Sequence, residues 1–123
     1  MASPSEISDE LDALASPLDS GVATPERLCT IANRAYCAAF RVLCDLLNID
    51  PAQRGAHEML RTEVLAVGHF QNPTIRLARL YVNDLYRTRV DADYGWHDRK
   101  RTVTAMRARL ALHQARQILE AAR

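Results

Sequence analysis

Apolar residues recur at every third or fourth position over most of this chain, which is the period of a helix with one buried face. The pattern predicts one short and four long helices, over residues 4–16, 25–48, 51–67, 73–94 and 98–122. The helix over 25–48 carries two adjoining apolar stripes, so we expect it to contact several other helices. These stripes are Leu28, Ala32, Ala35, Ala39, Val42 and Leu46, and then Tyr36, Phe40, Leu43 and Leu47.

The remaining helices each show one apolar side. The fourth is expected to bury Ile75, Ala78, Val82 and Leu85. The last is expected to bury Val103, Met106, Leu110, Ala111, Ala115, Ile118 and Leu119, with His113 partly buried on the same line.

Proline positions mark where the helices begin. A capping residue directly before proline is the arrangement of an N-cap followed by the first helical residue. It occurs at Ser3-Pro4, Thr24-Pro25, Asp50-Pro51 and Asn72-Pro73. Gly68 and Gly95 end the third and fourth patterns, and no alternating strand pattern is present. Short connections favour antiparallel neighbours, so we predict an all-α fold, an up-down bundle of four main helices plus a short N-terminal helix.

Composition and charge add two constraints. The chain has 123 residues, 48% of them apolar and 25% charged, which suits one domain with an ordinary core. We expect residues 1–23 to form the short helix and a loop, and 24–123 to form the bundle domain. Formal charge is −5 over residues 1–75 and +6 over 76–123. That asymmetry indicates either an anionic partner for the C-terminal half or two helices with solvated basic faces.

Several classes of function find no support in the chain. The three cysteines, Cys29, Cys37 and Cys44, form no CxxC pair and have no histidine at zinc-finger spacing, so zinc is not expected. The histidines show no metal-binding motif and no glycine-rich phosphate loop is present, so no other metal or cofactor is expected either. No signal peptide or membrane-length apolar run is present, so we expect a cytoplasmic protein with no membrane partner.

The run 89–97 holds the highest concentration of charged, aromatic and titratable side chains in the chain. Continuing the stripe of the fourth helix places Arg89 inward and Asp93 four residues later on the same face. One interpretation is an Arg89–Asp93 pair that closes the bundle end, covered by Tyr94 and Trp96. The other is a phosphate or nucleotide site in which Arg89 holds the phosphate, His97 moves a proton and Tyr94 stacks or hydrogen-bonds.

Two further groups extend this candidate site. His57 follows Arg54-Gly-Ala and either caps its own helix or faces Arg34 or Tyr36 across the bundle. The basic stretch Arg99-Lys100-Arg101 at the start of the last helix is either a contact surface for an RNA backbone or a solvated face.

Two motifs resemble those of HEPN domains (higher eukaryotes and prokaryotes nucleotide-binding). Arg89-x-x-Ala92-Asp93-Tyr94 resembles the RxxADY signature of that family's third core helix, and Arg34-Ala-Tyr36-Cys-Ala-Ala39-Phe40 resembles RAYYAAF on its first. His57 also lies where many relatives have a histidine. The resemblance covers roughly residues 24–122 and implies a helical bundle that is commonly a homodimer.

The resemblance also implies a set of functions. Many HEPN proteins are metal-independent endoribonucleases of toxin–antitoxin or defence systems, with an arginine and a histidine separated by four to six residues. Here Arg89 and His97 are separated by seven, and Cys37 stands where a second tyrosine is common. The first hypothesis is therefore an RNA- or nucleotide-binding module, with a cognate antitoxin or a nucleotidyltransferase as protein partner. The alternatives are an endoribonuclease that uses Arg89 and His97, and a protein-only interaction module or antitoxin-like scaffold.

Overall fold

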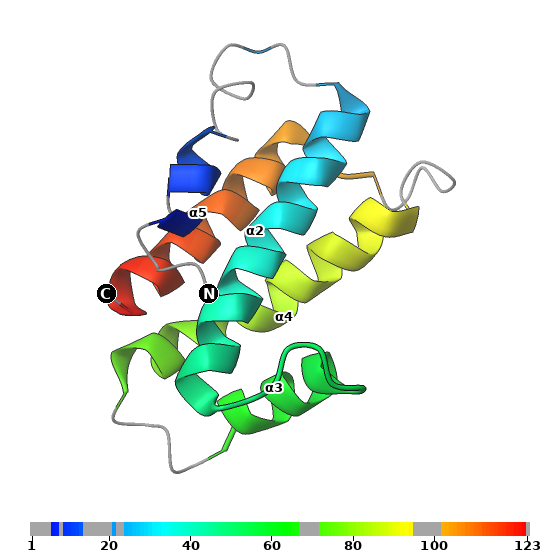
Figure 1. Cartoon of the computed structure of the whole chain (residues 1–123). Coiled ribbons are helices and arrows are strands. Elements are labelled where there is room, and N and C mark those ends of the chain that lie inside the picture. Colours follow the sequence, from blue (N-terminus) through cyan, green and yellow to red (C-terminus); the bar gives the residue numbers. More distant parts are fainter. Residues whose placement is uncertain are drawn as a thin grey trace.

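The computed structural model describes residues 6–7, 9–13, 21, 24–66, 72–94 and 102–122. Within these ranges it is all-α, with no strand. The main helices are α2 (Pro25–Leu47), α3 (Ala56–Val64), α4 (Pro73–Tyr94) and α5 (Ala105–Ala122). The long helices α2, α4 and α5 each pack against the other two, and α3 lies where α2 ends and α4 begins (Figure 1). The predicted bundle of four main helices plus a short N-terminal helix is confirmed.

Helices α2 and α4 begin at the predicted caps. Thr24 is extended, with φ −77° and ψ 163°, and its Oγ1 accepts a hydrogen bond of 3.3 Å from the backbone N–H of Arg27. Asn72 Oδ1 accepts hydrogen bonds from the backbone N–H groups of Thr74 and Ile75, at 2.9 and 3.3 Å. These bonds satisfy N–H groups that have no partner inside the helix, which is why the first turns form here.

Helix α3 is shorter than the predicted 51–67. Residues 51–55 form turns, in which Asp50 Oδ1 accepts from the backbone N–H of Ala52 at 2.9 Å. The helix begins only after Gly55, which has a φ of +79° and acts as its N-cap. A left-handed residue interrupts a right-handed helix, so the proline signal at Pro51 marks a turn here and not a helix start. The helix ends at Val64, and residue 67 lies outside the described ranges.

Helix α5 differs from its prediction in its start and in its buried face. Residues 102–104 are not helical, and Thr104 Oγ1 caps the helix by accepting from the backbone N–H of Arg107 at 3.1 Å; residues 98–101 lie outside the described ranges. Met106 is 78% exposed and Leu110 51% exposed, and His113 is also exposed, contrary to expectation. The prediction is confirmed for Val103, Ala111, Ala115, Ile118 and Leu119, which are buried together with Ala108, Leu112 and Gln114.

The core runs through all of these helices and includes the N-terminal segment. Ile7 and Leu11, from helical residues 6–7 and 9–13, are buried against the bundle. This segment lies beside α2 and α5 (Figure 1), and Asp12 Oδ1 is 2.7 Å from Arg116 Nη2 of α5. The short helix is therefore part of the same hydrophobic core as the bundle.

Candidate functional site

The most chemically distinctive cluster lies between α2, α3 and α4. Tyr36 Oη of α2 lies 2.6 Å from Nδ1 of His57, in the first turn of α3, and the two atoms share a hydrogen bond. The ring of Phe40, one turn after Tyr36, stacks on the His57 ring with centroids 4.1 Å apart. Tyr86 of α4 meets Tyr36 edge-on at 5.7 Å. Three helices thus enclose one hydrogen-bonded imidazole among aromatic rings.

Two arginines lie against this aromatic cluster. The Arg61 guanidinium of α3 lies 4.2 Å from the centroid of the Tyr86 ring, and that of Arg89 of α4 lies 5.2 Å from the Tyr36 centroid. Both side chains are half-buried, and the Nε atom of each is buried with no hydrogen-bond partner among the described residues. In the part of the chain that the structure describes, neither arginine forms an ion pair with an Asp or Glu side chain. No carboxylate there neutralises either positive charge.

This environment keeps both members of the hydrogen-bonded pair neutral. Burial raises the pKa of Tyr36 well above its ordinary value, although Arg89 and Arg61 act in the opposite direction. Burial lowers the pKa of His57, and the positive charges of Arg89 and Arg61 lower it further. The cluster at neutral pH is therefore two fixed cations beside an uncharged tyrosine–histidine pair.

The expected Arg89–Asp93 pair does not form among these residues. Arg89 is directed toward Tyr36, whereas Asp93 is exposed and lies toward Cys29 at the start of α2. The pKa of Cys29 is raised mainly by burial, then by the negative charge of Glu26, and last by that of Asp93. Near this end of α4, it is Asp91 that forms an ion pair. Its Oδ2 lies 2.8 Å from Arg107 Nη2 of α5.

The other predicted site residues do not join the cluster. Tyr94 is exposed at the end of α4. Arg34 lies on another side of α2, beside a small pocket that also involves Glu10 and Arg41, so it does not meet His57. Trp96, His97, Arg99, Lys100 and Arg101 lie outside the described residues.

Three members of the cluster were not named as site residues from the sequence. These are Arg61, Tyr86, and Phe40, which was expected only as part of an apolar stripe and of the first motif. The available signal was helical spacing. Phe40 follows Tyr36 by four residues and Arg61 follows His57 by four, and these separations place side chains on one helix face. Nothing in the local pattern shows that the faces of α2, α3 and α4 meet.

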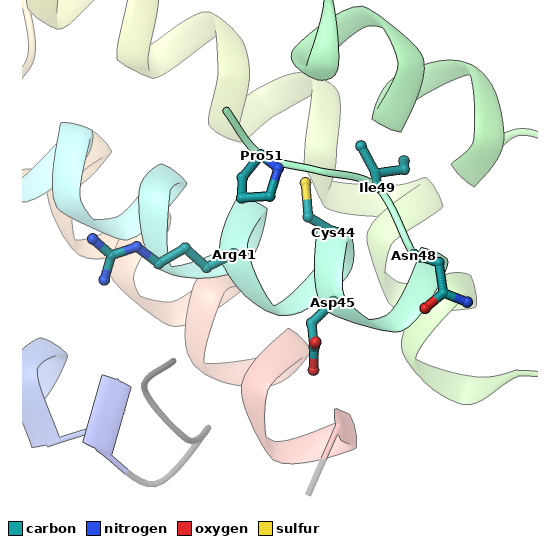
Figure 2. A pocket seen from close by; sticks show the side chains of 6 residues that line it. All are labelled: Arg41, Cys44, Asp45, Asn48, Ile49 and Pro51. Carbon is teal, nitrogen blue, oxygen red and sulfur yellow. The ribbon is translucent and has the colours of Figure 1, made fainter. Parts of the chain in front are cut away.

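A cavity of about 190 Å³ near the end of α2 is a weaker candidate. It is lined by Arg41, Cys44, Asp45, Asn48, Ile49 and Pro51, and the Cys44 sulfur points toward the loop that carries Ile49 and Pro51 (Figure 2). Burial, followed by the charge of Asp50, raises the pKa of Cys44 to about 11. A thiol that stays protonated at neutral pH is a poor nucleophile, so this cavity offers little reactive chemistry.

The structure and the comparisons with known proteins add three findings. The described part of the chain contains no group of three or more histidine, cysteine or acidic side chains suited to hold a metal ion. None of its helices is long and apolar enough to span a membrane. No protein-family model matches the chain, and no match was found among curated proteins or solved structures.

The lowered pKa of His57 predicts how stability depends on pH. Because this pKa is lower in the folded chain than in the unfolded chain, the unfolded chain binds a proton more readily. The contribution of His57 to the free energy of unfolding is thus fully present at pH values above the ordinary histidine pKa of about 6.5. This contribution is lost as the pH falls below that value. We expect denaturant unfolding to show a smaller loss of stability between pH 7.5 and 5.5 for His57→Gln than for the natural protein. His113→Gln, at an exposed histidine on α5, is the control and should keep the natural slope; equal slopes in all three proteins would contradict the assignment.

Proposed function

We propose that this protein is a HEPN-type RNA- or nucleotide-binding helical module that holds a phosphate at Arg61 and Arg89. The observation that carries the proposal is that two half-buried arginines without a described carboxylate partner flank the Tyr36–His57 pair. Arginine also suits phosphate because its planar fork can bind two oxygens at once.

The two motifs that resemble the HEPN family support this proposal because they supply residues to one cluster. Tyr36 and Phe40 come from the first motif, and Arg89 begins the second. Tyr36, Phe40 and Arg89 are therefore neighbours around His57, whereas Arg34, Asp93 and Tyr94 of the same two motifs lie elsewhere. We extend the proposal, on the resemblance, to a cytoplasmic homodimer that works in a toxin–antitoxin or defence system, with a cognate antitoxin or nucleotidyltransferase as partner.

Protein interaction is a second candidate function, favoured by one observation on α5. Met106 and Leu110, one turn apart, are both more than half exposed, and exposed apolar side chains grouped on one face are typical of contact surfaces. We place the contact with a second copy, or with a cognate partner, on this face.

RNA binding and RNA cleavage by the full chain test the proposal. We expect a fluorescently labelled single-stranded RNA of about ten nucleotides to bind at low salt and to dissociate as salt rises, because phosphate contacts release counterions. Binding without cleavage supports the binding module. Cleavage that is lost in both Arg89→Ala and His97→Ala overturns it in favour of the endoribonuclease. Failure to bind RNA or nucleotides at about 50 mM salt, where phosphate contacts are strongest, overturns both and leaves the protein-only function.

A further inference from the structure

The hydrogen bond between Tyr36 and His57 determines which imidazole nitrogen carries the proton. Tyr36 is 1% exposed, and its hydroxyl has Nδ1 of His57 as its hydrogen-bond partner among the described residues. If Nδ1–H donated to the phenol oxygen, the phenol proton would be buried without an acceptor there, which is costly. The favoured arrangement therefore has the Tyr36 hydroxyl donating to Nδ1. A neutral imidazole then carries its single proton on Nε2, which makes His57 a hydrogen-bond donor at that atom.

The charges around His57 define the kind of anion that would fit. The titratable groups that face it are Arg61 from its own helix, Arg89 and Tyr86 from α4, and Tyr36 from α2. The arginines contribute a formal charge of +2, and Tyr36, whose pKa is raised by burial, is uncharged at neutral pH. A terminal phosphate carries a charge of about −1.5 to −2 at neutral pH and has three free oxygens. An internal phosphodiester carries a single negative charge and has two free oxygens, so it matches this site less well.

We propose that the site selects a terminal phosphate group, with His57 Nε2–H as its third donor beside the guanidinium groups of Arg61 and Arg89. This inference rests on the proposed RNA- or nucleotide-binding function and names its ligand class. Tyr36 is a positioning residue in this site, because it acts on the ligand through His57. A histidine protonated on Nε2 has no free nitrogen for proton abstraction, so His57 binds the phosphate and does not act as a base.

The ligand class is tested by RNAs that differ only at their ends. One RNA of about ten nucleotides is prepared with a 5′-phosphate, with a 3′-phosphate and with hydroxyl groups at both ends. Adenosine monophosphate and adenosine form a second pair, which separates a free nucleotide from an RNA end as the source of the phosphate. We expect at least one phosphorylated ligand to bind about tenfold more tightly than its hydroxyl counterpart, since charged hydrogen bonds are added. His57→Ala should reduce that preference severalfold.

The role of Tyr36 is tested by a readout that does not depend on ligand binding. Long-range ¹H–¹⁵N correlation spectra of the natural protein distinguish the two imidazole tautomers, and we expect His57 to carry its proton on Nε2. Tyr36→Phe should produce a mixture of tautomers and a weaker preference for phosphate. Tyr81→Phe, which removes a phenol elsewhere on α4, should change neither.

The outcomes separate this inference from the proposed function. Equal binding within every pair, both the RNAs and adenosine monophosphate against adenosine, would overturn the terminal-phosphate selection and leave RNA or nucleotide binding standing. No binding of any RNA or nucleotide would overturn both. A His57 proton found on Nδ1 in the natural protein would overturn the donor role of His57 whatever the affinities, and it needs no variant that could fail to fold.

Discussion

Replacing Arg89 with alanine is expected to weaken the binding of a 5′-phosphorylated RNA by about 10- to 100-fold, the range for losing hydrogen bonds between charged groups. Arg89 lies against Tyr36 with its Nε buried, so its guanidinium is held in place before a ligand arrives. Arg89→Lys should recover only part of the affinity, because a lysine ammonium supplies charge without the planar fork. Fluorescence anisotropy at constant salt measures both effects.

Arg87→Ala is the matched control for this prediction. Arg87 precedes Arg89 by two residues on α4 but is exposed, so the variant removes the same charge from a different face of the same helix. We expect it to reduce affinity by less than about threefold, the effect of a screened surface charge. Equal losses in the two variants would show that binding responds to net charge alone, and would contradict a built site at Arg89.

Replacing Leu85 with alanine is expected to destabilise the fold by about 2–5 kcal/mol, the range for a large residue removed from a packed core. Leu85 is 0% exposed in α4, a helix that packs against both α2 and α5, so the space left by the shorter side chain can close only if packed helices move. This is a large part of the total stability of a domain of this size, about 5–15 kcal/mol. Urea unfolding followed by circular dichroism measures the change.

Leu80→Ala, five residues earlier on the same helix, makes the same chemical change at a surface position. Leu80 is 67% exposed, and we expect a change within about 0.5 kcal/mol. Helix propensity also changes equally in the two variants, so the difference between them isolates burial. If the two variants were equally stable, the packing of α4 described above would be wrong.

Helix positions could be predicted wherever the signal was local. Thr24 and Asn72 cap α2 and α4 by bonding to backbone groups two or three residues away, so short sequence motifs were enough. The same reasoning gave the wrong start for α3, because the left-handed conformation of Gly55 outweighed the signal at Asp50-Pro51. For α5 the periodicity correctly predicted that Ala111, Ala115, Ile118 and Leu119 are buried, but it wrongly added Met106 and Leu110, which are exposed.

Part of the candidate site could also be predicted. Tyr36, His57 and Arg89 were named from their residue types and from a family resemblance. A contact of His57 with Arg34 or Tyr36 was one of two alternatives, and the structure shows the contact with Tyr36. The sequence did not place Arg89 beside this pair. Among the described residues, the carboxylate near this helix end that forms an ion pair is Asp91, because Arg107 reaches it from α5, and Asp93 forms none with Arg89. Arg61 and Tyr86 had no motif of their own and are recognised only once α3 and α4 are seen to meet.

The sequence by itself determined that the chain forms helices, where α2 and α4 begin, and most of the residues that these two helices bury, although Leu46 of the predicted α2 stripe is 41% exposed. Periodicity and capping act over a few neighbouring residues, which is why they could be predicted. Only the tertiary structure decided that Met106 and Leu110 of α5 stay exposed and which side chains meet around His57. Tyr36 and His57 are 21 positions apart in the sequence, and Tyr36 and Arg89 are still farther apart. Such contacts depend on how whole helices pack against one another, and no local pattern records that choice.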